Sequence, residues 1–528
     1  MAADPRPCIL VLADQTPSWF SSPGAIAELL YLEGINDVEV QGLDRISPSL
    51  LEQRSLVILG PCDLGPAHAA MLLEHVAGGG GLISLLPGEA LTRTLGLGSP
   101  LKGILNGRIR IESAGYPEVS LPIKGWSQFY DLSGAGQAEQ IAPLLAEDDQ
   151  ETGYPAVLQL SHGKGKIVVF AYDLAASVYL LRQGNPAMAA GRSTGFARMR
   201  PSDLFYQWQD SRTAELPVAD LQCHFFRELV HRAWPEETVL PWVWYFPNGA
   251  GTVLLFTSDD DWSTVAEFDQ LLTALEKNNA SATFYLVQVD STMERCSLEA
   301  LVAKGFDFSI HPDLPPPTGA DWEHRLSAHI AQFEERYQRR PSSSVRNHCI
   351  AWAGYLKGVK IQSRLGFDVD ANYFTLAENG RCYMTGSGLM MPFVDLDGEV
   401  LPIFQLPTQF SEEAVLAHPD FTWSLNLTPD EGVRYISRLM LENRDRNQSM
   451  LCINSHPVSF ANYSASLWEP ILEFAKAEGI PVLNVDQYQA FWKARREIRL
   501  KPVRRGDVDG YQSANEGQFK IMFPDNRQ

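Results

Sequence analysis

Two absences in this sequence exclude broad classes of protein. No apolar run approaches the roughly 20 residues that a transmembrane helix needs, so no membrane span is expected. An excess of basic residues is also missing, because 43 Lys and Arg stand against 64 Asp and Glu and the formal net charge is −21. Nucleic acids and anionic membrane surfaces bind basic proteins, so neither is an expected partner.

A disulfide framework and a secretory signal are missing too. The seven cysteines are odd in number and scattered, without a C-x-x-C pair, which favours reduced thiols in a cytoplasmic protein. The start, MAADPRPCILVLAD, has neither a basic n-region nor an apolar h-region. A chain whose leader had been removed would look the same, so a cytoplasmic location is the expectation and not the only reading.

Two series of alternating strands and helices follow one another along the 528 residues, and this length favours two or more domains. The first series has strand patterns at 8–14, 55–60 and 81–87, and a hairpin pattern at 153–174. The second series has strand patterns at 252–257, 282–287, 306–311 and 450–456. Repeated β-α units predict parallel sheets, and their number in the second series suggests a barrel or partial barrel.

Polar residues gather at the predicted strand ends of the second series, where parallel barrels carry their active sites. They are Asp259, Asp260, Asp261, His311, Asp313, Arg346, His348, Asp368, Asp370 and His456. Three consecutive carboxylates repel one another unless solvent or a cation stabilises them. Imidazoles and carboxylates together are ligands that suit Zn²⁺, so a metal beside one free aspartate would explain the stretch TSDDD.

The order Thr-x-Asp-Asp, strand-end His, Arg and a late His that follows an apolar strand (LCINSH) resembles the polysaccharide deacetylases with a NodB-homology domain. The resemblance implies a distorted (β/α)7 barrel and metal-dependent removal of an N-acetyl or related acyl group from a carbohydrate. It implies that Asp259 is the catalytic base, that Arg346 orients it and that His456 is the general acid. Asp260 and His311 are the implied metal ligands.

One position departs from that family pattern. Four residues after His311, where the family has its second metal-binding histidine, this chain has Pro315, whose side chain cannot bind a metal. His348 is the first candidate for a replacement ligand and Asp313 is the second. A divalent metal, zinc first, is therefore expected on Asp260, His311 and His348.

The first series resembles the class I glutamine amidotransferase-like fold, a flavodoxin-like domain, in the non-catalytic version found beside carbohydrate enzymes. Catalytic members carry a cysteine on the turn after the Gly-rich segment, where this chain reads SLLPGEA, and Cys62 lies one strand too early. Glutaminase activity is therefore not expected. The resemblance implies that this domain provides a surface for homo-oligomer assembly.

We thus expect an amidotransferase-like α/β domain (1–190), a connecting segment (191–250), a NodB-like barrel (251–497) and a C-terminal tail (498–528). The expected function is metal-dependent deacylation of a carbohydrate. Two alternatives stay open: an inactive barrel that binds glycans or serves in assembly, which Pro315 favours, and a metal amidase acting on a small non-sugar amide. Trp262, Trp352 and Tyr373 are candidates for a sugar-stacking platform, although core packing explains aromatic residues equally well.

Overall fold

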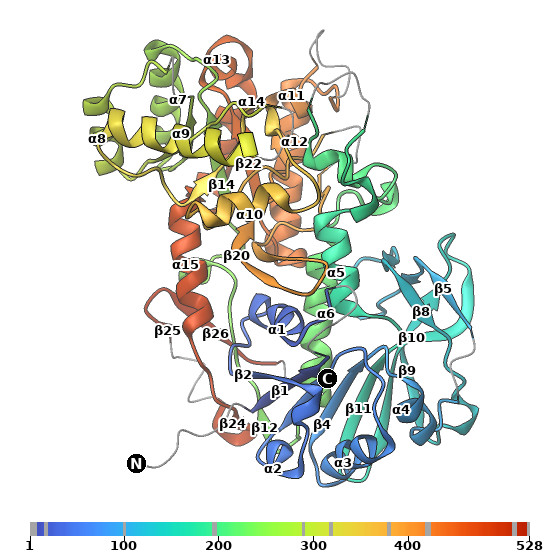
Figure 1. The fold of residues 1–528 in the computed structure, drawn as a ribbon. Helices are drawn as coiled ribbons and strands as arrows, with labels where there is room; N and C mark the ends of the chain where they lie inside the picture. The colour runs from blue at the N-terminus through green and yellow to red at the C-terminus, as the bar shows by residue number, and fades with distance from the viewer. Residues whose placement is uncertain are drawn as a thin grey trace.

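The computed structural model describes residues 8–14, 20–98, 102–113, 115–192, 198–287, 291–315, 320–376, 382–417, 424–508 and 515–524. Its strands and helices confirm the mixed α/β class. Figure 1 shows two regions, an N-terminal one in blue to cyan and a second one in yellow to red, with helices α5 (Leu174–Gln183), α6 (Val218–Ala233) and α15 (Val485–Glu497) where they meet.

The N-terminal region is built on a sheet that has nine strands within the described residues. Its parallel part runs in the order β2 (Val38–Gly42), β1 (Ile9–Ala13), β3 (Leu56–Leu59), β4 (Gly81–Leu85), β11 (Gly165–Phe170). Side chains of a strand alternate between its two faces. Ile9 and Val11 therefore enter the main core with helix α1 (Pro23–Leu32), whereas Leu10 and Leu12 enter a smaller core with α3 (Pro66–Ala77).

The same sheet continues through antiparallel strands that the flavodoxin-like expectation did not include. In order, these are β10 (Glu151–His162), β9 (Ala138–Leu145), β6 (Arg108–Ile109) and β7 (Leu121–Pro122). The pairing of β10 with β11 confirms the predicted hairpin, and Gly163 supplies the positive φ of 58° that its turn requires.

The second region holds two sheets, and among the described residues no closed barrel forms. The first sheet is parallel in the order β16 (Asp307–Ile310), β15 (Thr283–Leu286), β14 (Leu254–Asp259), β22 (Leu451–Ser455), β21 (Phe410–Ser411), with β23 (Val482–Leu483) beside β14. The second runs β17 (Ser344–Val345), β18 (Val369–Asp370), β20 (Val400–Gln405), β19 (Met391–Val394). The edge strands β16 and β17 are joined by isolated contacts and not by a ladder, since the Ser342 N–H donates to the Phe308 carbonyl at 2.9 Å.

Helices flank the first of these sheets. They are α7 (Val265–Lys277), α8 (Arg295–Ala303), α9 (Ala320–Tyr337), α12 (Pro429–Glu442) and α14 (Ala465–Ala477). Helices α7 and α12 each begin with a reciprocal capping box, Thr264 with Glu267 and Thr428 with Glu431, which fixes where each strand-to-helix turn ends. No helix among the described residues is long and apolar enough to cross a membrane.

The segments expected to be a connection and a tail contain paired structure. Residues 191–250 include α6, and β12 (Thr238–Val239) and β13 (Trp242–Val243) pair with β24 (Val503–Arg504) and β26 (Phe519–Met522) from 498–528. Strands this short leave no periodic signal, so the charged composition suggested an unpaired tail.

A buried ionic cluster joins the two regions, and we call it the interdomain cluster. Glu33, at the end of α1, contacts His224 Nδ1 at 2.9 Å and Arg227 Nη1 at 2.9 Å, and it accepts the Tyr245 hydroxyl. Burial would raise the pKa of Glu33, but His224 and Arg227 outweigh burial and lower it. The second nitrogen of His224 lies 3.0 Å from the carbonyl oxygen of Asn447, so the cluster is fully paired.

Candidate active site

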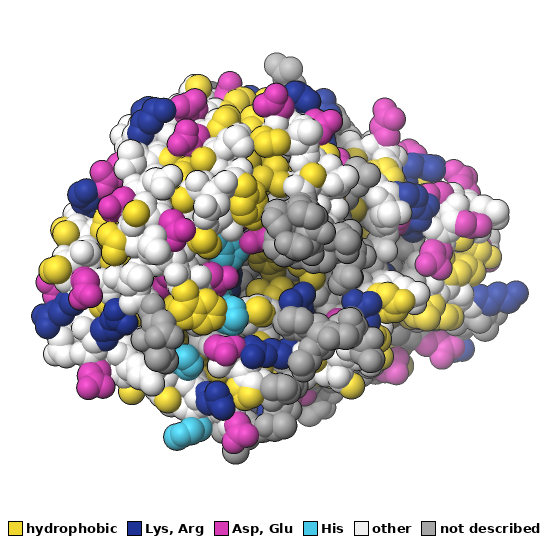
Figure 2. Space-filling view, turned by 90° about the horizontal axis from the view of Figure 1, so that it is seen from above, with side chains coloured by type: hydrophobic (Ala, Val, Ile, Leu, Met, Phe, Trp, Pro, Cys, Tyr) yellow, Lys and Arg dark blue, Asp and Glu magenta, His cyan; other side chains and the backbone are white. Residues whose placement is uncertain are grey.

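A cavity of about 270 Å³ opens at the carboxyl ends of β14, β16 and β22. Figure 2 looks onto this end of the molecule and shows a hollow bordered by histidine and acidic side chains. The lining residues are Arg200, Asp259, Asp261, His311, Cys349, Ile350, Phe374, Leu376, Ser411, Glu413, Asn454 and His456. The cavity therefore lies at the strand ends where the sequence analysis expected polar residues to gather.

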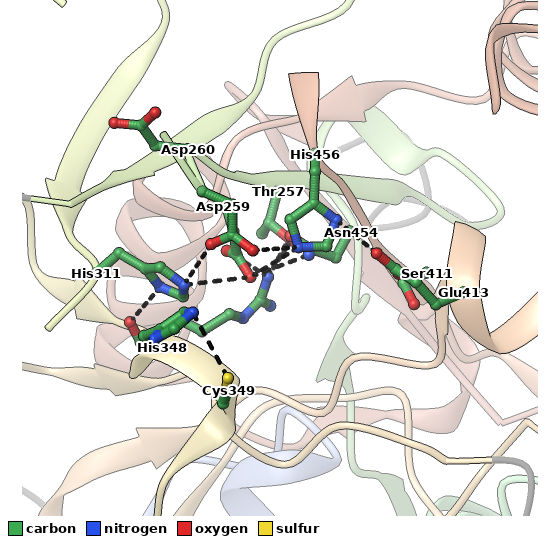
Figure 3. Close-up of polar contacts among 12 residues, drawn as sticks. Thr257, Asp259, Asp260, His311, His348, Cys349, Ser411, Glu413, Asn454 and His456 are labelled. Carbon is green, nitrogen blue, oxygen red and sulfur yellow. Dashed lines mark hydrogen bonds and ion pairs between the residues drawn. The ribbon is translucent and has the colours of Figure 1, made fainter. Parts of the chain in front are cut away.

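Asp259 is the last residue of β14, and two side chains hold its carboxylate. Arg346 Nη1 lies 3.3 Å from Oδ1, and Asn454 Nδ2 donates to Oδ2 at 3.1 Å (Figure 3). Arg346 is fully buried and also donates to Thr257 Oγ1 at 2.8 Å and to the Ala371 carbonyl at 3.0 Å. The structure thus brings the predicted base and the predicted orienting arginine into contact.

The next two aspartates point in different directions. Asp261 turns toward the histidines, with Oδ1 at 3.2 Å from His311 Nε2 and Oδ2 at 3.5 Å from His456 Nε2. Asp260 points away from them (Figure 3), and its Oδ1 accepts the Ser263 backbone N–H at 3.1 Å. Burial raises the pKa of Asp260 to about 6. The structure therefore does not bring the predicted ligand Asp260 to the histidines, and Asp261 stands in its place.

The reason for this exchange lies in the turn that follows β14. The strand ends at Asp259, and the turn, in which Asp261 has φ 41° and Trp262 has φ 59°, directs Asp261 toward the histidines while Asp260 points away. Both values are left-handed for residues other than glycine, a strain that is often found at functional sites.

His311 follows β16 and is oriented by the backbone. Its Nδ1 lies 2.9 Å from the Arg346 carbonyl oxygen, which only accepts, so Nδ1 carries a proton. Nε2 then faces the carboxylates, with Asp259 Oδ2 at 4.0 Å in addition to Asp261. Burial would lower the pKa of His311, but the charges of Asp259 and Asp261 raise it overall.

His456 follows β22 and is held by two glutamates that the sequence analysis missed. Its Nδ1 lies 2.8 Å from Glu412 Oε1 and 3.0 Å from Glu413 Oε1, both at the start of α11 (Glu412–Val415). Its Nε2 points into the cavity, 3.9 Å from Asp259 Oδ2. Burial would lower the pKa of His456, but Glu413 and Glu412 raise it well above its usual value. The only available signal was their place after the short strand β21.

His348, the predicted replacement ligand, has other partners. Its ring centroid lies 5.5 Å from that of His311, but its Nδ1 is 3.2 Å from Asp313 Oδ1 and its Nε2 is 3.5 Å from Cys349 Sγ. The structure therefore places His348 beside the candidate ligands without directing it at their carboxylates.

Of the remaining predicted residues, few reach the cavity. Trp352 and Tyr373 are fully buried in the core, whereas Trp262 is 47% exposed and contacts the His348 ring at the mouth. Asp370 is buried and accepts from Asn372, at 2.7 Å. Asp368 pairs with Lys493 on the surface at 2.7 Å. Core packing therefore accounts for two of the three candidate stacking residues.

The donors around His311 fit a divalent metal in their chemistry. Imidazole nitrogen and carboxylate oxygen are zinc ligands, and two ligands of one tetrahedral ion lie roughly 3.3 Å apart, close to the separation seen here. Asp261 Oδ1 is buried and makes no hydrogen bond of good geometry, although His311 Nε2 is 3.2 Å away. Among the described residues, neither group of three donors within 4.8 Å of one another includes His311. Asp261 and His311 are thus the two candidate ligands that the structure brings together.

Comparison with known proteins gives no match to any family model and none among curated proteins. Polysaccharide deacetylases are among the similar solved structures. One, from Mycobacterium smegmatis, is 16% identical with a TM-score of 0.38 and covers 49% of this chain and 96% of its own. Agd3, described as a novel carbohydrate deacetylase, is 9% identical with a TM-score of 0.39 over 92% of this chain and 87% of its own. PuuE allantoinase is 13% identical with a TM-score of 0.37 over 47% of this chain and 93% of its own. These values are low, so a functional assignment has to rest on the residues of the site.

Proposed function

We propose that this protein hydrolyses the N-acetyl or a related N-acyl group of a carbohydrate, with a divalent metal bound beside Asp261 and His311. One observation carries the proposal: a carboxylate and a histidine that retains its proton face each other in one cavity, with Asp259 Oδ2 and His456 Nε2 3.9 Å apart. Amide hydrolysis needs both groups, because the attacking water loses a proton and the leaving amine gains one.

On the base side, Asp259 takes the proton from water. Its two oxygens are held by Arg346 and Asn454 at 3.3 Å and 3.1 Å, so the carboxylate cannot rotate away from the cavity. Arg346 also keeps a full positive charge beside it, because the charge of Asp259 raises the pKa of the guanidinium despite the opposing effect of burial. An ionised, fixed carboxylate is what a general base requires.

On the acid side, His456 gives a proton to the leaving nitrogen. Glu412 and Glu413 accept from Nδ1, so the proton available for transfer sits on Nε2, which faces the cavity. An amine anion is a very poor leaving group, and this protonation removes that obstacle.

The proposed metal ligands differ from those expected from sequence. Asp261 and His311 hold the ion, whereas the positions of Asp260 and His348 do not support their expected roles. A bound divalent cation, zinc first, polarises an acyl oxygen and makes water a stronger nucleophile. The backbone carbonyl that accepts from His311 Nδ1 is the kind of outer contact that orients metal-binding histidines.

The walls of the cavity support a sugar as substrate. Ile350, Phe374 and Leu376 line it together with the polar residues, and the exposed Trp262 directly follows the cavity-lining Asp261. A pyranose ring has apolar C–H faces and a polar rim, which match a site with one apolar wall and one polar wall.

The test is acetate release from N-acetylated chitin oligosaccharides by the full-length protein, loaded with zinc or treated with a chelator. Asp261→Asn and Asp260→Asn form a matched pair of neighbouring aspartates. We expect near-stoichiometric zinc and zinc-dependent acetate release in the native protein and in Asp260→Asn, and loss of both in Asp261→Asn.

Three outcomes would count against this proposal. Zinc content that depends on Asp260 and not on Asp261 would overturn the ligand assignment. Zinc binding without hydrolysis of any N-acetylated sugar would support the inactive, glycan-binding alternative. Hydrolysis confined to small non-sugar amides would support the amidase alternative.

A further inference from the structure

A second chemical grouping reaches the same cavity through Cys349 and has no part in the deacylation described above. It consists of Cys349, His348 and Asp313, with His348 Nε2 at 3.5 Å from Cys349 Sγ and His348 Nδ1 at 3.2 Å from Asp313 Oδ1. Cys349 is exposed to solvent and lines the cavity, and Figure 3 shows its sulfur next to the His348 ring. Nucleophile, base and orienting carboxylate thus lie in a row.

The hydrogen bonds of this row fix the tautomer of the neutral imidazole. An ionised carboxylate only accepts, so the Asp313 contact places the proton of His348 on Nδ1. Nε2 is then left with its lone pair toward the thiol, as a general base requires. Arg198 also pairs with Asp313, so the carboxylate that orients His348 is itself held by a guanidinium.

The backbone around the thiol is held in an unusual conformation. Cys349 has φ 54° and Ile350 has φ 48°, which are left-handed values for residues other than glycine, and one of them is β-branched. Flanking contacts hold the loop, since Asn347 Nδ2 donates to the Ala351 carbonyl at 2.8 Å and the His348 N–H donates to the Pro312 carbonyl at 3.0 Å. A strained turn that presents a nucleophile is a recurrent arrangement in acyl-transfer enzymes.

We propose that Cys349, His348 and Asp313 form a second acyl-hydrolysis site, thiol-based and metal-independent, for short activated acyl esters or thioesters. The thiol is protonated at rest, because partial burial raises the pKa of Cys349. Its proton must therefore leave as the new bond forms, which is the role the geometry gives to His348. Activated esters are the fitting class because they already carry a good leaving group, and the cavity of about 270 Å³ favours a short acyl chain.

The chemistry balances in two steps. Cys349 Sγ attacks the acyl carbon while His348 Nε2 takes the thiol proton, the bond to the alcohol or thiol leaving group breaks, and that proton passes to the leaving group. The product of this step is a thioester on Cys349. Water then attacks the thioester, giving its proton through His348 to the departing sulfur, and free carboxylic acid and the original thiol result.

The experiment uses p-nitrophenyl acetate with the full-length protein after chelation and in an Asp259→Asn background, so that the proposed deacylase is silent. Cys349→Ser is compared with Cys296→Ser, which removes another exposed cysteine. We expect the Cys349 variant to lose turnover by about 100-fold or more and the Cys296 variant to keep it. Acid-quenched protein should carry one acetyl group on the Cys349 peptide.

His348 supplies a readout that a structural defect would not give. His348→Ala should slow acetylation of Cys349, and added imidazole should restore part of the rate, because it supplies the missing base. Melting temperatures of all variants establish that each is folded. Unchanged turnover in Cys349→Ser, acetyl groups on other residues only, or no effect of imidazole would overturn the proposal, whatever the outcome for N-acetyl sugars.

Discussion

Two clusters of buried charge in this molecule resemble each other in composition and differ in how completely their members are paired. In the interdomain cluster, both carboxylate oxygens of Glu33 and both ring nitrogens of His224 have partners. The two ring nitrogens of His224 lie 2.9 Å and 3.0 Å from theirs. In the cavity, His311 and His456 lie 3.2 to 4.0 Å from the aspartates, and Asp261 Oδ1 makes no hydrogen bond of good geometry.

The difference separates a stabilising role from a chemical one. When one partner is removed from a buried and fully paired cluster, the free energy of unfolding falls by several kcal/mol, because the remaining charges stay buried without a partner. An open, incompletely paired cluster keeps room for a ligand and holds pKa values away from their usual range, as active sites do. Variants in the two clusters should therefore fail in opposite ways.

The largest effect on activity is expected for Asp259→Asn. Removing the base should lower kcat for acetate release by about 10² to 10⁴. The melting temperature should fall, but by less than in Glu33→Gln, because the fully buried Arg346 loses its carboxylate partner and keeps its hydrogen bonds with Thr257 Oγ1 and the Ala371 carbonyl. Asp173→Asn is the control, since Asp173 is a carboxylate of the N-terminal region that caps α5 through the Ala176 N–H. An equal loss of activity in both variants would break the comparison.

The largest effect on stability is expected for Glu33→Gln. Without this carboxylate, Arg227 and His224 stay buried beside a neutral partner, and the free energy of unfolding should fall by about 3 to 5 kcal/mol. Activity measured well below the melting temperature should be nearly unchanged. Urea unfolding and acetate release on the same preparation test both parts, and a selective loss of activity would contradict the assignment.

The same residue gives a pH signature of stability. Because the folded-state pKa of Glu33 is lowered, its contribution is present above its unfolded pKa of about 4.3 and is lost as pH falls through the folded value. In Glu33→Gln the acid-side loss of stability should therefore be smaller than in the native protein.

A smaller effect is expected for Glu413→Gln. Glu413 raises the pKa of His456, so its removal lowers that pKa and moves the alkaline limb of the pH–kcat profile to lower pH. At alkaline pH, kcat should fall about tenfold, as is usual for outer partners of functional histidines. Glu469→Gln, on the exposed side of α14, serves as control. An unmoved alkaline limb would show that His456 is not the proton donor.

The smallest effect is expected for Trp262→Ala. Loss of this exposed ring at the mouth should raise KM for an oligosaccharide roughly 3- to 10-fold, the size of one aromatic contact, with kcat and melting temperature unchanged. Initial-rate kinetics with short and long oligosaccharides provide the measurement. A fall in kcat would mean instead that Trp262 supports the left-handed turn at Asp261.

The sequence allowed the placement of the site and not its detailed pairing. Continuous apolar runs such as LLFT and LCIN are typical of buried parallel strands, whose carboxyl ends lie at one edge of a sheet. Asp259, His311 and His456, which follow such runs, were therefore predicted to lie close together. Arg346 joined them because it follows β17, although that strand is too short to recognise. Which of Asp260 and Asp261 faces the histidines depends on a turn with two left-handed residues, and no residue type in DDDW predicts such a turn.

Long-range partners were beyond sequence reasoning. Glu412 and Glu413 precede His456 by more than forty residues and reach it only because β21 pairs with β22. His348 could be recognised as a neighbour of the site, but its preference for Asp313 and Cys349 depends on loop geometry. The division of the parallel strands between two sheets likewise could not be read from strand patterns, because β17 and β18 have only two residues each.

The contacts of the Arg495 guanidinium determine how late in synthesis the N-terminal region can complete its hydrogen bonds. It donates to the backbone carbonyls of Tyr31 and Leu32 at the end of α1, and Asn36 donates in turn to the Arg495 carbonyl. The carbonyl oxygens at the end of α1 therefore receive these side-chain hydrogen bonds only after a residue 464 positions beyond Tyr31 has been synthesised. A chain that ends before Arg495 lacks the donor for the carbonyl oxygens of Tyr31 and Leu32. The two regions are therefore expected to complete their folding together.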